Sequence, residues 1–150
     1  MKMIKTEWAN GILMLMLIGI YFLIIEALGL TDNFYLRLVN IVLVATPVNL
    51  AIMQRAQSQE STYLSLFKSG VYTSIIGIGL SVVALGFYMG MIMSPREIKE
   101  VSNSILVGTG GASIFQICLS IGIEAMVSAF LITFILLQYW KNYSPVRDNT

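Results

Sequence analysis

Two glutamates lie inside hydrophobic runs that are long enough to cross a membrane, and their side chains are the best placed in this sequence to do chemistry. Glu26 lies in "FLIIEALGL" and Glu124 lies in "SIGIEAMVSAF". Acidic residues in such segments are costly, and they often mark the path of an ion or a proton. Two acids at one site would tend to share a proton, because two like charges cannot both ionise cheaply in a low dielectric. The pair therefore predicts one possible ion or polar site.

Counting along the helices places both acids at a similar depth. Measured from the tryptophan at the end of each run, Glu26 lies about 27 Å along the first helix and Glu124 about 24 Å along the last. Arg37 and Asn40, which follow the first run, are the candidate partners of these acids. Structural pairing with them is one interpretation, an ion or proton site is a second, and a contact with another subunit or a lipid head group is a third.

The residue types that are missing exclude several classes of function. The sequence has no histidine, which removes His-ligated haem, most catalytic zinc sites and His-based acid–base chemistry. Its single cysteine, Cys118, cannot form an intrachain disulfide or a dithiol redox pair. A cluster of Lys and Arg and a Gly-rich phosphate loop are also missing, which argues against binding of nucleic acids or nucleotides. We expect no catalytic residues, no metal, no cofactor and no enzymatic activity.

The composition indicates how the acids are positioned. Charged residues make up 11% of the 150 residues, against about 25% in soluble domains, and hydrophobic residues make up 57%. Runs of roughly 20 apolar residues recur, each long enough for about 30 Å of hydrocarbon. We predict an all-α polytopic membrane protein with one domain, 1–150, and four transmembrane helices at about 8–30, 35–54, 69–93 and 112–140. An S-x-x-E capping box at Ser94 and Glu97 predicts a short amphipathic helix between the third and fourth spans, lying on the membrane surface.

The basic residues predict the orientation of these spans. With both termini in the cytoplasm, the inner segments hold six Lys and Arg residues and the outer segments hold three. Inner loops carry the excess of Lys and Arg, and tryptophans such as Trp8 and Trp140 favour the interface. The sequence therefore predicts a multi-pass protein with both termini cytoplasmic.

Small and polar residues line single faces of the third and fourth spans. On the fourth span Gln116, Ser120, Glu124 and Ser128 recur every four residues, so we expect Glu124 to face the bundle interior or a partner chain. On the third span, small residues let another helix approach closely, either within the bundle or from another subunit. The predicted helix-packing residues are Gly70, Ser74, Gly77, Ser81, Gly86 and Gly90.

Two stretches, "YLSLFKSGVYTSIIGIG" and "IEAMVSAFLITFILLQYWKN", give the chain its resemblance to a known family. The chain resembles small four-span bacterial inner-membrane proteins whose family is described only as a domain of unknown function. The resemblance implies a bacterial inner membrane, and it implies no activity.

Two functions remain. The first is a non-enzymatic accessory or assembly subunit of a larger membrane complex, or a homo-oligomer, with membrane lipids and other subunits or its own copies as partners. The second is a minimal ion- or proton-coupled transporter or channel that uses Glu26 and Glu124.

Overall fold

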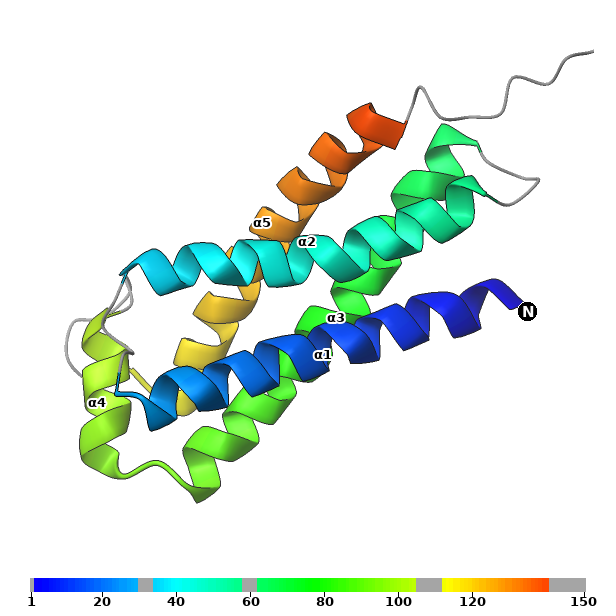
Figure 1. Ribbon diagram of the computed structural model, residues 1–150. Helices are drawn as coiled ribbons and strands as arrows, with labels where there is room; N and C mark the ends of the chain where they lie inside the picture. The colour runs from blue at the N-terminus through cyan, green and yellow to red at the C-terminus, as the bar shows by residue number, and fades with distance from the viewer. Residues whose placement is uncertain (1, 30–33, 58–61, 105–111, 141–150) are drawn as a thin grey trace, which may run out of the picture.

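The protein is described here from a computed structural model, which places residues 2–29, 34–57, 62–104 and 112–140. Those residues are almost entirely helical and contain no strand. Four long helices form a bundle, and a short helix lies at one end of it (Figure 1). Their bounds are α1 Lys2–Ala27, α2 Phe34–Ala56, α3 Tyr63–Met91, α4 Pro95–Ser104 and α5 Ile114–Trp140.

The four long helices are each long and apolar enough to cross a membrane. Large apolar side chains lie on the outside of these helices, and more than half of the surface of Ile20, Val83 and Ile135 is exposed. Exposed apolar surface on this scale is unusual for a soluble monomer and is expected where lipid is the solvent. The all-helical bundle thus has the properties of a polytopic membrane protein.

The helix ends differ from the predicted spans, because polar flanks continue the helices beyond the hydrophobic runs. The third helix begins at Tyr63 rather than near residue 69, and the first begins at Lys2. Gly29 takes a positive φ of 65° just after α1, a left-handed conformation that commonly ends a helix. Pro47 lies inside α2 and is buried.

The α3 helix is the centre of the bundle. It packs against α1, α2 and α5, and α2 also contacts α1 and α5, whereas α1 and α5 are not among the closely packed pairs. The start of α1 and the end of α5 lie at the same end of the bundle, opposite α4 (Figure 1). We call these two ends the N-terminal end and the α4 end.

Buried apolar side chains fill two clusters. The larger joins all four long helices and includes Met14, Val48, Ile52, Leu66 and Leu137. The smaller one, at the α4 end, surrounds Met89, Ile117 and Cys118 and is covered in part by Ile98 and Val101 of α4. The α4 helix therefore packs its apolar side against the ends of α3 and α5.

The predicted capping box starts α4. The Ser94 backbone N–H donates to Glu97 Oε2 at 2.6 Å, and the Glu97 N–H donates to Ser94 Oγ at 3.4 Å. The Ser94 N–H and the Ser94 hydroxyl, which donates to Glu97 Oε2 at 2.8 Å, hold the pKa of Glu97 below its ordinary value of 4.5. The equivalent bonds between Ser113 and Gln116 start α5. Gln116 therefore caps a helix, and an S-x-x-Q pattern in the sequence was the signal for this role.

Candidate functional site

Glu26 lies on α1 near the α4 end and is half-buried. The Tyr88 side chain of α3 lies next to its carboxylate. The ring of Phe22, one turn earlier on α1, packs edge-on against Tyr88 with 5.5 Å between the ring centroids. Glu26 thus joins α1 to α3 through a tyrosine, a partner that sequence reasoning did not name.

Glu124 lies on the exposed surface of α5. The expectation that it faces the bundle interior is not what the structure shows, because its four-residue ridge turns away from α3. The polar spacing establishes that these side chains share a face, whereas the neighbouring helices decide where that face points. The other expected direction, toward a partner chain, is compatible with this exposure.

The structure does not bring Glu26 and Glu124 together. Their helices pack on α3 without packing closely on each other. A Cβ added at Gly122 would lie 3.3 Å from Val82, which places Glu124 near the level of residue 80 on the antiparallel α3. Glu26 lies at the level of Tyr88, so the two acids differ in depth by roughly 12 Å. The count along the sequence from Trp8 and Trp140 did not give this difference, because the two tryptophans do not lie at the same level of the bundle.

The other two residues of the predicted polar site both lie on α2. Asn40 is exposed on α2. Arg37 lies in α2, but its side chain is outside the described residues.

The small residues of α3 contact two different neighbours. A Cβ at Gly70 would lie 2.7 Å from Thr133 Cγ2 of α5, and a Cβ at Gly77 would lie 2.5 Å from Met14 Sδ of α1. A Cβ added at Gly86 would lie 3.5 Å from Cys118 Sγ of α5, whereas a Cβ added at Gly90 would meet no atom within 4 Å. Close packing within the bundle accounts for these residues up to Gly86.

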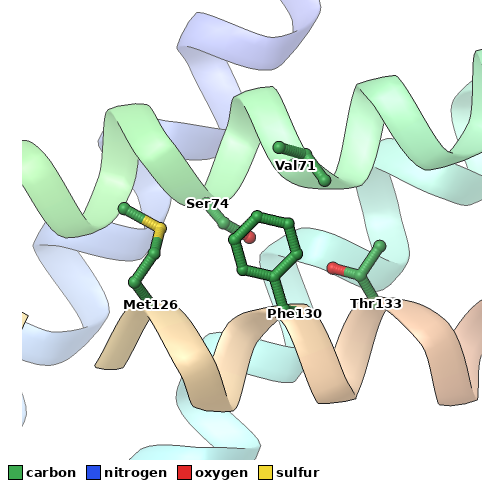
Figure 2. A pocket seen from close by; sticks show the side chains of 5 residues that line it. All are labelled: Val71, Ser74, Met126, Phe130 and Thr133. Carbon is green, nitrogen blue, oxygen red and sulfur yellow. The ribbon is translucent and has the colours of Figure 1, made fainter. Parts of the chain in front are cut away.

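The hydroxyls on that helix are used within it. Ser74 donates to the Gly70 carbonyl at 2.9 Å, and Ser81 donates to the Gly77 carbonyl at 2.8 Å. Figure 2 shows Ser74 beside Phe130 and Thr133, where α3 meets α5. This seam has no room for a water-sized molecule, so it is a packed contact and not a binding pocket.

A polar cluster at the N-terminal end of the bundle was missed by the sequence analysis. Glu7 and Asn10 of α1 are both buried, with 8% and 5% of their surfaces exposed. Ser69 Oγ donates to Glu7 Oε1 at 3.1 Å, and Asn10 Nδ2 donates to Gln54 Oε1 at 2.9 Å. We call Glu7, Asn10, Gln54, Ser69 and the buried Thr73 the Glu7 cluster. Its signal in the sequence was the spacing of Glu7 and Asn10 with the buried Met14, which places all three on one helix face.

A second polar link lies at the same end of the bundle. Trp140 Nε1 donates to Asn49 Oδ1 at 2.8 Å and so ties the end of α5 to α2. Within the described ranges, three side chains of His, Cys, Asp or Glu do not gather at any one place. The Glu7 cluster can therefore offer one carboxylate together with neutral oxygen ligands.

Comparisons with models of protein families, with curated proteins and with solved structures gave no match to this chain.

Proposed function

We propose that this chain is a non-enzymatic integral membrane protein that acts by assembling with other transmembrane helices, as an accessory subunit of a larger complex or as a homo-oligomer. The surface for this assembly is the exposed face of α5 that carries Ser120, Glu124, Val127 and Leu131. We refer to it as the Glu124 face.

The position of Glu124 carries this proposal. It lies ten residues into α5, roughly 15 Å from the start of a helix of apolar side chains, and it is exposed. An acidic residue near the centre of a membrane helix costs about 2.5 to 3.5 kcal/mol on insertion scales. A partner that supplies a hydrogen-bond donor or a cation removes this cost, because it satisfies the carboxylate away from lipid.

The residues around Glu124 suit a helix as the partner. Ser120 lies one turn before Glu124 on the same face, and its small side chain permits a close approach. Val127 and Leu131 continue the face with exposed apolar side chains. A second copy of the chain could supply the donor from its own Ser120 hydroxyl.

The native mass after mild extraction tests this function in three variants. Glu124→Leu removes the carboxylate, Ser120→Phe adds bulk while keeping it, and Val83→Phe alters an exposed position on α3 as the control. We expect wild type and Val83→Phe to remain assembled and the two α5 variants to run as single chains. Single chains in every case would reject the proposal, and so would full assembly of both α5 variants.

We place the protein in the bacterial inner membrane with both termini cytoplasmic and with α4 lying along the outer surface. The excess of Lys and Arg in the segments that the sequence assigns to the cytoplasm supports this orientation, and so does the end of α5, at Trp140, at the N-terminal end of the bundle (Figure 1). A cysteine at Asn103, in a Cys118→Ser background, should react with an impermeant maleimide added to intact cells. A cysteine at Asn149 should react only after lysis, and its labelling from outside would reverse the topology.

A further inference from the structure

The Glu7 carboxylate is buried and only half satisfied. Oε1 accepts a hydrogen bond from Ser69, whereas Oε2 has no hydrogen-bond partner among the described residues. The Ser69 hydroxyl also lies 3.4 Å from the carbonyl oxygen of Ala51 on α2. Oxygen atoms from α1, α2 and α3 therefore meet around Ser69, although that hydroxyl has a single proton to donate.

Thr73 adds a further oxygen to this region. Its side chain is completely buried, and its Oγ1 has no partner within the described part of the chain. Ser74 and Thr133, also buried, donate to the carbonyl one turn earlier in their own helices, which is the usual solution for a hydroxyl inside a helix. The Thr73 hydroxyl does not donate to the carbonyl one turn earlier. It lies between Ser69, which contacts Glu7, and Gly77, which contacts Met14, and so it is on the side of α3 that faces α1.

Burial of a charged carboxylate with an unpaired oxygen is unfavourable unless a positive charge or a proton compensates it. Lys5 is exposed. Arg55 of α2 donates through Nε to Ser65, one turn before Ser69 on α3. A small ion at the Glu7 cluster would satisfy both Glu7 Oε2 and Thr73 Oγ1, because it binds the oxygen lone pairs that both groups offer.

We propose that the Glu7 cluster binds one monovalent metal cation, Na⁺ or K⁺, between α1 and α3. Its oxygen ligands are the Glu7 carboxylate, the Ser69 and Thr73 hydroxyls and the Ala51 carbonyl. Such hard oxygen ligands suit alkali and alkaline-earth ions, and Ca²⁺ sites usually contain several carboxylates. With a single carboxylate, the charge of the cluster matches an ion of charge +1.

The bound cation stabilises the folded state, because it binds the folded chain and not the unfolded one. The purified full chain is heated in detergent in NaCl, KCl or choline chloride at constant ionic strength. We expect the unfolding midpoint to rise with the concentration of one metal salt and to stay constant in choline. Equal midpoints in all three salts would overturn the proposal.

Variants connect the effect to the cluster. Thr73→Val keeps the shape of the side chain and leaves Glu7 intact, and it should weaken the apparent cation affinity by about 10-fold or more. Glu7→Gln should abolish the cation dependence, whereas Thr133→Val, the same change at a buried threonine that bonds within α5, should preserve it. A cation effect that persists in Thr73→Val and Glu7→Gln would move the site elsewhere and so reject the assignment.

Arg55→Gln separates a cation site from an ion pair. If Arg55 neutralises Glu7, this variant loses stability and the wild type shows no dependence on the metal. If the cation neutralises Glu7, removal of a nearby positive charge strengthens cation binding. Equilibrium dialysis of the folded wild type with radioactive Na⁺ or K⁺ provides a second measurement that does not depend on how the variants fold, since wild type should retain one ion per chain.

Discussion

Gly77 is the position where a single methyl group should disturb the bundle most clearly. A Cβ there would lie 2.5 Å from Met14 Sδ and 2.8 Å from Met14 Cβ, and Met14 is completely buried. Because the Met14 Cβ is fixed to the backbone of α1, this clash can be relieved only if α1 and α3 move apart. Overpacking of this kind costs about 1 to 3 kcal/mol. Alanine gains about 1 kcal/mol over glycine in helix propensity, which leaves Gly77→Ala destabilised by about 0 to 2 kcal/mol.

Gly79 is the matched control, because it lies two residues away on the same helix and its built Cβ meets nothing within 4 Å. Gly79→Ala has the same gain in propensity without the clash. The difference between the two variants, about 1 to 3 kcal/mol, therefore isolates the steric cost. Unfolding in a mixed-micelle titration followed by circular dichroism measures it.

A second substitution tests whether Met14 is the cause. Met14→Ala in the Gly77→Ala background should recover part of the loss, and the coupling between the two sites should differ from zero. Equal stability of Gly77→Ala and Gly79→Ala would refute the close contact of α1 with α3.

Two further perturbations address the polar contacts at the two ends of the bundle. Trp140→Phe keeps the aromatic body but loses the donor to Asn49, and we expect a loss of about 1 kcal/mol in the same titration; an unchanged midpoint would show that the bond contributes nothing. The stability of the α4 cap should depend on pH, because the pKa of Glu97 is lowered in the folded state. The stabilisation that Glu97 gives to α4 is therefore complete above its ordinary pKa of 4.5, and it is lost as the pH falls through the lowered pKa of the folded state. Amide exchange in α4 should therefore accelerate in that acid range in wild type and not in Ser94→Ala, and equal acid sensitivity of the two would contradict the capping role.

The four long helices could be predicted from the sequence because each is marked by a long hydrophobic run, and length and hydrophobicity are properties of each segment alone. The capping box of Ser94 and Glu97 could be predicted for the same reason, since its partners lie three residues apart. Each of these features is decided locally, without information about the neighbouring helices.

Features that depend on rotation and level between helices could not be predicted in this way. The ridge of Ser120 and Glu124 has a clear period, but only the packing of Gly122 against Val82 fixes which side of α5 faces α3. Glu7 was overlooked because it lies at the start of a span next to Trp8, where an acid is ordinarily solvated. Its burial results from the approach of Ser69 on a helix that begins more than fifty residues later.

The central claim, that the Glu124 face is covered by another protein helix, is tested most directly by photo-crosslinking in native membranes. A benzophenone amino acid is placed at Val127 on that face and, as the control, at Val83 on the exposed side of α3. We predict a discrete protein adduct from position 127 and none from position 83, with the mass of the adduct distinguishing a second copy from another subunit. The absence of a protein adduct at position 127 would show that Glu124 faces lipid, and the proposed function would be wrong.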